Sequence, residues 1–290
     1  MTEDAIGAVE LEGLPLFRRG KVRDTFALDG RLLMVATDRI SAFDCVLPDL
    51  IPGKGRLLTA LARHWFQRTA ELVPNHLLPD DPGILPAPLW ERMAERSMLV
   101  RRAERIDVEC VVRGRLAGSG WEEYQSQGTL AGEPLPPALT FGAELDRPRF
   151  TPATKSDSGH DQNISRAELR EVVGPETADQ LEETSIRLYR AGALGYLRAG
   201  FVLVDTKFEF GWIDGRLTLI DELLTPDSSR LWEVGSAGAS PGFDKQPVRD
   251  WLLASGWNRQ PPGPRLPPEL ILETSRRYQE VLTRTLSSAS

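Results

Sequence analysis

The sequence predicts an α+β fold of two lobes, and three features of its 290 residues lead to this prediction. Residues 14–47 contain short apolar runs separated by turn signals, which is typical of antiparallel strands. Residues 175–200 and 269–286 have the apolar spacing and the flanking proline or glycine of helices. Strands come first and a mixture follows, and this order indicates an α+β class.

The N-terminal part of the chain is expected to form a meander of strands followed by a helix. Residues 14–47 hold the apolar runs, and Asp29–Gly30 is typical of a tight turn between two of them. After a turn signal at Pro52–Gly55, apolar residues recur at helical spacing between positions 57 and 66. The proline-rich stretch 74–88 is expected to be a loop.

The predicted domain boundary follows this region. Residues 97–112 indicate a strand, a turn and a second strand, and the hinge is expected near Ala103–Asp107. The division is a β-rich N-terminal lobe over residues 1–104 and a mixed lobe over residues 105–290. A stretch rich in proline and glycine, 128–162, is expected to be a loop.

Helix-start signals characterise the C-terminal part. Ser165 and Glu168 have the spacing of a capping box, in which a serine oxygen and a glutamate carboxylate satisfy free amides of the first turn. A longer helix is expected over 175–200, where a glycine permits the left-handed conformation that ends helices. Residues 201–222 indicate a hairpin, and prolines precede a last helix over 269–286.

Composition and charge exclude several classes of protein. A net charge of −7 argues against a general binder of nucleic acid or anionic membranes, but a phosphorylated small molecule needs only a local cluster of cations. No segment approaches the roughly 18 consecutive apolar residues of a membrane helix, and the N-terminus lacks signal-peptide features. Cys45 and Cys110 are expected to be reduced, buried thiols. We therefore expect a cytoplasmic protein, monomeric or a small homo-oligomer.

The segment FVLVDTKFEFG, residues 201–211, carries the most specific pattern. Asp205, Lys207 and Glu209 alternate with apolar or uncharged residues, so the three side chains share one face of a strand. The following run ends in Asp221, a second carboxylate that, with Glu209, has the oxygen ligands that Mg²⁺ prefers. Lys207 would then place a cation on phosphate oxygens. The alternative is a solvated strand face with one salt bridge.

Two further segments are candidates for anion binding. In RRGKVRD, Gly20 lets backbone amides approach a phosphate that Lys21 can also reach, although a plain basic hairpin has the same pattern. In VECVVRGRLAGSGW, a strand leads to Arg113 and Arg115, and a Gly-Ser turn presents Ser119. Guanidinium groups bind phosphate or carboxylate with two parallel hydrogen bonds. Surface arginines at a strand end remain the alternative.

Two polar loops complete the candidate segments. In LLTPDSSRLW, Asp227 and Ser229 lie beside Arg230, which offers hydroxyls and a cation, although a plain turn or helix cap has the same composition. The loop TPATKSDSGHDQNIS contains Lys155, Asp157 and His160, and long polar loops often carry function. A solvated histidine without a catalytic role is the alternative for His160.

Taken together, these segments resemble the phosphoribosylaminoimidazole-succinocarboxamide synthase, or SAICAR synthetase, family of de novo purine synthesis. The matching stretches run in family order from about residue 14 to 257 and include the extended GFDKQPVRDWL region of the longer form. Asp107 replaces a proline that many members have. The stretches are RGKVRDTF, ATDRISAFD, IPGKGRLLTAL, VECVVRGRLAGSGWEEY, FTPATKSDSGHDQNIS, LVDTKFEFG, DELLTPDSSRLW and GFDKQPVRDWL.

The resemblance implies an activity and a fold. The family joins L-aspartate to a carboxylated aminoimidazole ribonucleotide, with ATP as cosubstrate, Mg²⁺ as cofactor, and ADP and phosphate as products. Its fold has a kinase-like antiparallel N-terminal lobe and an ATP-grasp-like mixed C-terminal lobe, with ATP between them. The alternatives are a related ATP-dependent kinase or ligase with another acceptor, and a nucleotide-binding regulator without turnover.

The resemblance also implies roles for residues of the matching motifs. Phosphate binding is implied for Gly20, Lys21 and Lys207, and metal binding for Glu209 and Asp221. Ribonucleotide binding is implied for Arg113, Ser119, Asp227, Ser229 and Arg230. Four residues are implied to line the same cleft with looser roles, namely Asp38 among the substrate-binding residues and Lys155, Asp157 and Asp205 among the catalytic ones.

A shared metal site predicts the geometry of the 201–222 hairpin. A two-residue turn at Asp214–Gly215 pairs Phe208 with Asp221, and this places Asp221 on the face opposite to Glu209. A three-residue loop pairs Lys207 with Asp221 and brings the two carboxylates to one face. We therefore predict an odd-length loop or a β-bulge of equal effect, although the Asp-Gly dipeptide favours the two-residue turn.

Overall fold

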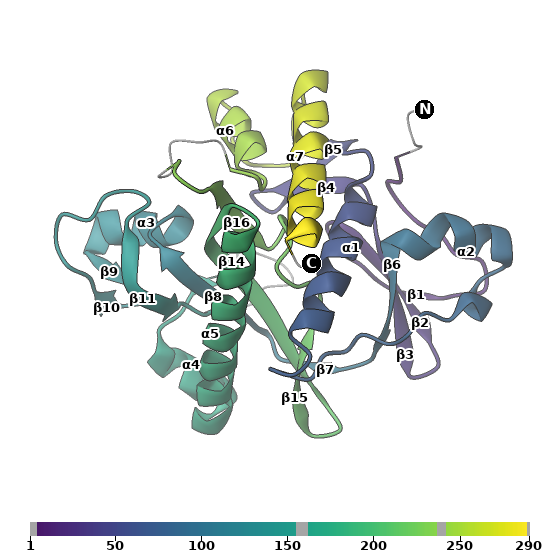
Figure 1. Cartoon of the computed structure of the whole chain (residues 1–290), viewed down its shortest axis with the longest axis horizontal. Coiled ribbons are helices and arrows are strands. Elements are labelled where there is room, and N and C mark those ends of the chain that lie inside the picture. Colours follow the sequence, from purple (N-terminus) through teal and green to yellow (C-terminus); the bar gives the residue numbers. More distant parts are fainter. Residues whose placement is uncertain (1–4, 155–161, 237–241, 289–290) are drawn as a thin grey trace.

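The computed structural model describes residues 5–154, 162–236 and 242–288, and helices and mainly antiparallel strands in these residues form an α+β fold (Figure 1). The fold class predicted from the sequence is confirmed. The strands form a smaller sheet on one side of the molecule and a larger sheet on the other (Figure 1).

The N-terminal meander is confirmed. It forms a sheet in the order β1-β2-β3-β6, and Asp29 and Gly30 both have positive φ in the tight turn between β2 and β3. Between β3 and β6 in the chain, β4 and β5 form a separate hairpin. The strands are β1 (Leu16–Arg19), β2 (Arg23–Leu28), β3 (Arg31–Ala36), β4 (Arg39–Ala42), β5 (Cys45–Leu50) and β6 (Ser97–Arg101).

The larger sheet is built around β14 (Phe201–Ile213), which pairs with β7, β8, β15 and β16. Strands β9 to β12 lie within 128–162, so the loop predicted for that stretch is wrong over these residues. The other strands are β7 (Glu104–Arg105), β8 (Val108–Arg115), β11 (Glu144–Phe150), β12 (Ala153–Thr154), β13 (Gln162–Asn163), β15 (Arg216–Ile220) and β16 (Ser229–Glu233). Strands β9 (Thr129–Leu130) and β10 (Glu133–Pro134) form a separate pair.

The strongly periodic helices were predicted and the shorter ones were not. Helices α1 (Lys54–Arg68), α5 (Pro175–Arg198) and α7 (Pro268–Ser287) are confirmed, as is the capping box that starts α4 (Arg166–Val173). Helix α3 (Gly118–Gln127) and helix α6 (Gln246–Ala254) were not predicted. Within the predicted 74–88 loop, a turn of 3₁₀-helix (Pro82–Ile84) and the start of α2 (Ala87–Met93) occur, and a second 3₁₀ turn (Ala94–Arg96) follows.

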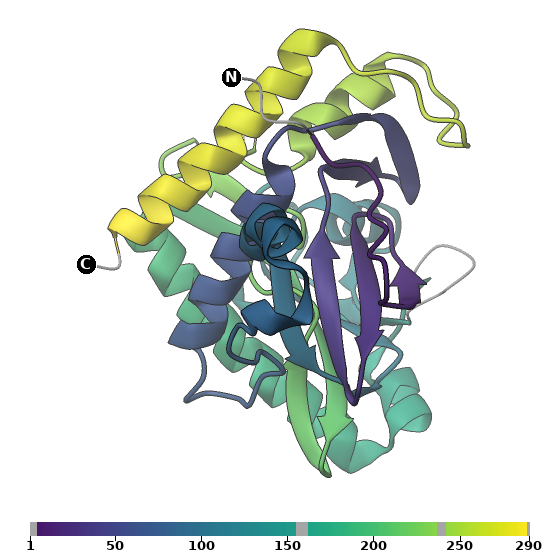
Figure 2. The same cartoon turned by 90° about the vertical axis from the view of Figure 1, so that its right-hand side faces the viewer.

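The main core joins elements from both predicted lobes. It contains Met34 and Trp65 from the N-terminal part together with Phe208 and Phe210 from β14. Helix α5 packs against β14, and α7 lies along α1 in both views (Figures 1 and 2). The smaller sheet ends at Arg101 and the larger one begins at β7, but a lobe boundary at residue 104 stays a prediction.

The segment 74–78 connects the two sheets by backbone hydrogen bonds. The His76 amide donates to the Leu219 carbonyl at 3.1 Å, and the Arg101 amide donates to the His76 carbonyl at 2.8 Å. This segment therefore positions β6 relative to β15, at the point where the hairpin leads to Asp221.

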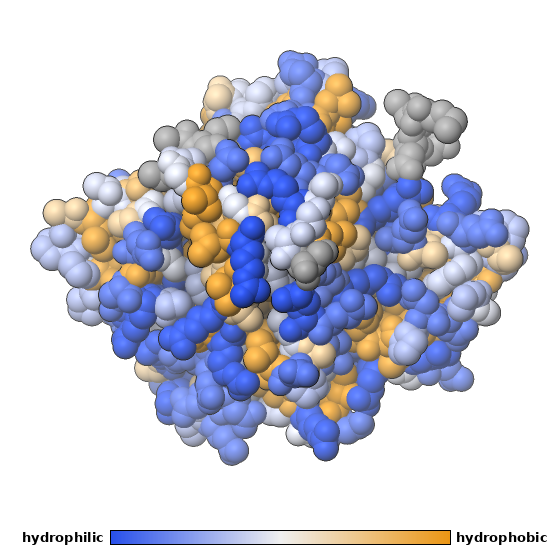
Figure 3. All heavy atoms as spheres, in the orientation of Figure 1, coloured by the Kyte–Doolittle hydropathy of each residue, from blue (hydrophilic) through white to orange (hydrophobic). Residues whose placement is uncertain are grey.

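Apolar side chains are mainly internal. On the face seen in Figure 3, hydrophilic residues cover most of the surface and hydrophobic residues form small separate patches. Cys45 and Cys110 are buried free thiols, as predicted. Among the described helices, none has the length and apolar character needed to cross a membrane.

Candidate active site

A cavity of about 700 Å³ lies between the two sheets and receives residues from both. This volume is typical of sites for small molecules. One wall comes from the turn between β1 and β2 and the turn between β4 and β5. The other wall comes from β8, β14, residues 220–230 and the start of α6.

The predicted polar face of β14 forms the floor of this cavity. Asp205 is opposite Arg113 and Lys207 is opposite Val111 in the antiparallel pairing of β14 with β8. Directly opposed residues share a face, so the charged residues of both strands line the cavity together. Phe208 faces the core instead. The alternation read from the sequence thus corresponds to one polar face and one buried aromatic face.

Lys207 lies between two carboxylates on this floor. Its Nζ is 2.6 Å from Glu109 Oε1 and 3.7 Å from Glu209 Oε1. Burial lowers the pKa of Lys207, but the two carboxylates outweigh burial and raise it above its usual value, so the side chain stays charged. Sequence reasoning missed Glu109. Its position four residues before Arg113, on the same strand face, was the available signal.

The hairpin that leads to Asp221 has the two-residue turn, so the predicted odd-length loop is wrong. Ile213 pairs with Arg216 and the even register continues to the pair Glu209–Ile220. Asp214 and Gly215 both have positive φ, as the favoured hairpin turn requires. The ladder ends before Asp221, whose own φ is 68°.

The left-handed conformation of Asp221 explains how the two-residue turn is compatible with Glu209 and Asp221 lining one cavity. Had the ladder continued, Asp221 would share the buried face of Phe208. Instead the backbone turns at Asp221, and its carboxylate lines the cavity that also contains Glu209. Non-glycine residues at positive φ are uncommon in proteins, and those that occur are concentrated at functional sites. A local change of backbone conformation, not the strand register, brings the two carboxylates to one site.

Arg23 and His76 surround Asp221. Arg23 Nη2 lies 2.7 Å from Asp221 Oδ2 and 3.4 Å from Glu222 Oε1, so a residue of β2 contacts the larger sheet's acids. His76 lines the cavity together with Asp221. Burial, and then the charge of Arg23, lower the pKa of His76 to about 3, so the imidazole is neutral.

Asp205 holds two arginines of the cavity. Its Oδ2 accepts hydrogen bonds from Arg113 Nη1 at 3.0 Å and from Arg230 Nη1 at 2.6 Å. Arg113 Nη2 also donates to Ser119 Oγ at 2.9 Å. Gly118 has a φ of 54°, which favours glycine, and a Cβ there would lie 2.2 Å from the Arg230 guanidinium, so a larger residue would displace this side chain. The contacts with Asp205 hold the two arginines side by side.

A second group of buried charges surrounds Asp227. Its Oδ2 lies 2.7 Å from Lys54 Nζ and 3.5 Å from Lys245 Nζ, and its Oδ1 accepts a hydrogen bond from Tyr278 at 2.9 Å. Burial raises the pKa of Asp227, but Lys245 and Lys54 outweigh burial, and the pKa lies below its usual range. Lys54 belongs to α1, Tyr278 belongs to α7 and Lys245 is the N-cap residue of α6, so no local pattern could have connected these partners.

Comparison with known proteins identifies the family. The family model described as SAICAR synthetase matches residues 16–264. The phosphoribosylaminoimidazole-succinocarboxamide synthase of Desulfosudis oleivorans is 47% identical over 280 residues, covering 94% of this chain and 96% of the relative. The enzyme of the same name from Polaromonas sp. is 48% identical over 296 residues, covering 97% and 98%. The chain belongs to the SAICAR synthetase family.

A solved structure of the family has the same fold. The SAICAR synthase from Saccharomyces cerevisiae, complexed with SAICAR, superposes with a TM-score of 0.88 at 39% identity, covering 98% of both chains. This agreement over nearly the whole length extends the two-lobed architecture of the SAICAR synthetases to this chain. Asp107, the departure from the family pattern, pairs with Arg105 at 2.7 Å at the entry to β8, away from the floor of the cavity.

Most residues that the resemblance singled out meet at the cavity. Its lining includes Gly20, Lys21, Asp205, Lys207, Glu209, Asp221, Asp227, Ser229 and Arg230, together with Arg113. Ser119 is exposed and contacts Arg113, although it does not line the cavity itself. Lys21 is exposed and contacts Asp44 of the facing turn. Lys155, Asp157 and His160 lie outside the described residues.

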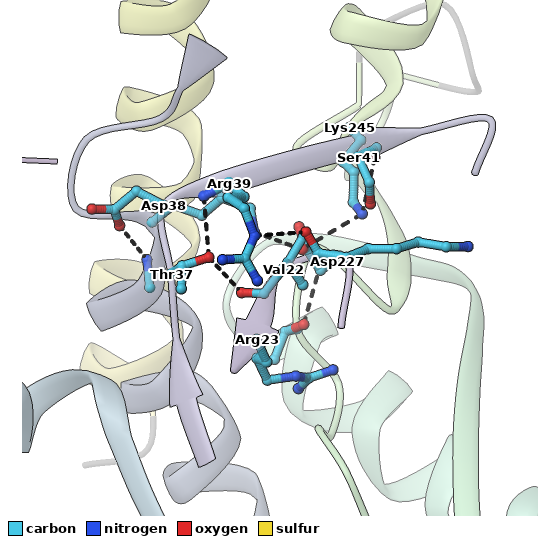
Figure 4. A network of polar contacts seen from close by, with 12 residues as sticks. Val22, Arg23, Thr37, Asp38, Arg39, Ser41, Asp227 and Lys245 are labelled. Carbon is cyan, nitrogen blue, oxygen red and sulfur yellow. Dashed lines mark hydrogen bonds and ion pairs between the residues drawn. The ribbon is translucent and has the colours of Figure 1, made fainter. Parts of the chain in front are cut away.

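Asp38 is placed differently from the substrate-binding position that the resemblance implied. Its side chain is fully buried, and it accepts hydrogen bonds from the amides of Ile6 and Gly55 at 2.8 Å and from Arg96 at 3.2 Å. Asp38 is not part of the cavity lining, and in Figure 4 its carboxylate points away from Asp227. It connects the N-terminal segment to the start of α1, which is a structural role.

The carboxylates of Glu209 and Asp221 have the oxygen atoms that a magnesium ion shared with phosphate would need. Within residues 5–154, 162–236 and 242–288, no group of three or more acidic, histidine or cysteine side chains forms a ready metal cage. Mg²⁺ characteristically uses one or two carboxylates together with water and phosphate oxygens. Glu209 and Asp221 line one cavity beside Lys207, and this donor set fits such an ion.

Proposed function

We propose that the chain catalyses the reaction of its family. L-Aspartate would be joined to 5-amino-1-(5-phospho-ribosyl)imidazole-4-carboxylate, with ATP converted to ADP and phosphate, to give SAICAR. The observation that carries the proposal is a single cavity that contains two separate groups of charged residues. One group is Lys207 with its neighbouring carboxylates, a cation for phosphate beside oxygen donors for Mg²⁺, and the other is the pair Arg113 and Arg230.

The reaction must first activate a carboxylate, because a carboxylate resists attack by an amine. Transfer of the γ-phosphoryl group of ATP to the imidazole carboxylate gives an acyl phosphate, from which phosphate can leave. The aspartate amine then attacks the acyl carbon, and phosphate departs as the amide forms. These two reaction steps require that the triphosphate and the imidazole carboxylate lie side by side. The position of Lys207 on the cavity floor would allow this arrangement.

Lys207 would bind and orient the phosphoryl group that is transferred. It stays protonated between Glu109 and Glu209, so it supplies a fixed positive charge where negative charge moves during the transfer. Gly20 and Lys21, on the turn opposite, would contact the other phosphates. Mg²⁺ held by Glu209 and Asp221 would supply charge neutralisation on the phosphate oxygens.

Arg113 and Arg230 would bind the phosphate of the ribonucleotide. Guanidinium groups recognise phosphate with paired hydrogen bonds, and Ser119 adds a hydroxyl beside Arg113. Asp205, which the resemblance implied as catalytic, contacts both arginines and is proposed to position them. Ser229 lines the same region, with its hydroxyl 2.9 Å from Thr206 Oγ1.

A cytoplasmic location, and a monomer or small homo-oligomer, remain predictions.

Steady-state ADP release tests the proposed function against its alternatives. The purified chain is assayed with Mg²⁺ and ATP, adding L-aspartate and the imidazole carboxylate ribonucleotide singly and together. Release that requires both acceptors supports the ligase. Release with ribonucleotide alone, or with a different acceptor, would indicate a related kinase or ligase. Binding of ATP without any release would indicate a regulator, and either outcome would refute the proposal.

A further inference from the structure

The turn between β1 and β2 is held by side chains that lie outside the cavity. Gly20, Lys21 and Val22 of this turn line the cavity, whereas Thr37 and Arg39, at the entry to β4, do not. A turn that binds phosphate through its backbone must direct N–H groups to the ligand. The groups that orient this backbone therefore influence how phosphate binds.

The carbonyl groups of the turn all accept hydrogen bonds from the segment 37–39. Arg39 Nη2 donates to the Gly20 carbonyl at 3.0 Å, and Arg39 Nε donates to the Lys21 carbonyl at 3.0 Å. The Val22 carbonyl accepts from the Thr37 amide at 3.0 Å and from the Thr37 hydroxyl at 2.8 Å (Figure 4). Three consecutive carbonyl groups therefore point to one side of the turn.

The direction of these carbonyls determines the direction of the amides. In a trans peptide, the C=O of one residue and the N–H of the next point in opposite directions. The carbonyls of Gly20 and Lys21 point to Arg39, so the amides of Lys21 and Val22 point away from it. Among the described residues, none accepts a hydrogen bond from these two amides. Two adjacent N–H groups on one side of a turn are the donors of an anion-binding backbone.

Arg39 is itself fixed by a buried carboxylate and by the N-terminal segment. Asp24 is fully buried, and its two oxygens accept from Arg39 Nη2 at 2.8 Å and from Arg39 Nη1 at 3.2 Å. Arg39 Nη1 also donates to the Gly7 carbonyl. A guanidinium group can hold several acceptors at once because its five N–H donors have a fixed planar geometry. The turn is thus connected through one side chain to β2 and to residues before β1.

A second arginine of the chain has the same contacts at a different turn. Arg284 donates to the carbonyls of Ala199 and Gly200 at 2.9 and 3.1 Å and to Glu280 Oε1 at 3.2 Å. This turn connects α5 to β14 and does not line the cavity. The two arginines differ in what their turns face, so Arg284 offers a matched control for a purely structural role.

We propose that Arg39 is a positioning residue for ATP, because it directs the amides of Lys21 and Val22 to the phosphates. This inference rests on the proposed function, which places phosphates of ATP at this turn. Arg39 acts through the peptide groups of the turn and not by contact with the nucleotide. Its effect on binding is therefore expected to depend on the phosphates and not on the nucleoside.

The test compares the binding of the nonhydrolysable ATP analogue AMP-PNP with that of adenosine, by ligand-observed NMR titration with Mg²⁺ present. Arg39→Lys keeps the charge, but its single ammonium group cannot hold two carbonyls and Asp24 together. We expect the Kd for AMP-PNP to rise about 10-fold, because the turn amides lose their orientation. The Kd for adenosine is expected to stay within about twofold, because adenosine has no phosphate.

Thr37→Val is a milder variant, since it removes one of the two donors to the Val22 carbonyl. It is expected to raise the Kd for AMP-PNP about threefold and to leave the Kd for adenosine unchanged. If Arg39→Lys does not fold, Thr37→Val decides the test. In assays of ADP release, Arg39→Lys is expected to raise the KM for ATP about 10-fold and to leave the other two KM values within about threefold.

Arg284→Lys is expected to lower the midpoint of thermal unfolding and to leave the Kd for AMP-PNP unchanged. An unchanged Kd for AMP-PNP in the folded variants of Arg39 and Thr37, or an equal rise in the Kd for adenosine, overturns the positioning role. Binding of AMP-PNP needs no turnover, so the two proposals can fail separately. A wild type that binds AMP-PNP but releases no ADP with both acceptors present would overturn the proposed function alone.

Discussion

Replacing Asp205 with asparagine would test whether this residue holds the arginine pair. The substitution keeps the shape and one acceptor oxygen but removes the negative charge between Arg113 and Arg230. Asp205 is 5% exposed and Arg113 is 4% exposed, so the remaining positive charges would be poorly compensated by water. We expect a less stable protein whose arginines depend on a bound anion for their arrangement.

The expected loss follows from the burial of the pair. Removing one partner of a buried ion pair costs about 3–5 kcal/mol, and the retained acceptor places Asp205→Asn near the lower value. For 290 residues the entropy of unfolding near 60 °C is about 0.6 kcal/mol/K. The midpoint of thermal unfolding is therefore expected to fall by roughly 5 °C.

The assay is thermal unfolding with and without saturating inorganic phosphate. Phosphate is expected to stabilise Asp205→Asn more than the wild type, because it replaces the missing charge between the arginines. Asp214→Asn is the control, since the pair Arg101–Asp214 is largely exposed and such pairs contribute about 0–1 kcal/mol. Equal midpoints for the two variants, with no extra effect of phosphate, would refute the reasoning.

Three further changes test the remaining assignments. Glu209→Ala and Asp221→Ala are each expected to lower kcat by about 10²-fold or more, because they remove a ligand of the phosphate-bound ion; ADP release within threefold of wild type in both variants would contradict the metal site. Arg113→Ala and Arg230→Ala are expected to raise the ribonucleotide KM far more than the ATP KM, and equal rises would show that the two anion sites are wrongly divided. Lys245 has a folded pKa of about 8, below its usual 10.5, so its contribution to the unfolding free energy falls as pH decreases through this interval. The thermal midpoint of Lys245→Met relative to wild type is thus expected to rise as the buffer pH is lowered from above 10.5 to below 8, and a pH-independent difference would contradict the pKa.

Local sequence patterns predicted the elements that depend on local interactions. Helix α5 begins at Pro175, and the capping box of Ser165 and Glu168 forms as its spacing indicated, because both depend on neighbours within one or two turns. The short helices α3 and α6 escaped prediction. Each is ten residues or fewer, so neither shows enough repeats of an apolar pattern to be recognised.

Within the candidate site, the sequence alone determined which residues share a strand face. Side chains alternate along any extended strand, so Asp205, Lys207 and Glu209 were certain to lie together once β14 formed. The resemblance to the family predicted that Arg113 and Arg230 belong to the same site, because both lie in motifs that the family assigns to ribonucleotide binding. These inferences needed no knowledge of how the lobes pack.

Only the tertiary structure decided how distant residues complete the site. Asp221 reaches the cavity because its backbone adopts a left-handed conformation beside His76 and Arg23, whereas counting residues along the hairpin predicted a different loop. Lys54, at the start of α1, and Lys245, the N-cap residue of α6, meet at Asp227 although they are far apart in the sequence. The physical reason is that the pairing of buried charges depends on how distant helices and strands pack against each other. Local sequence patterns do not specify the distance between side chains on such elements.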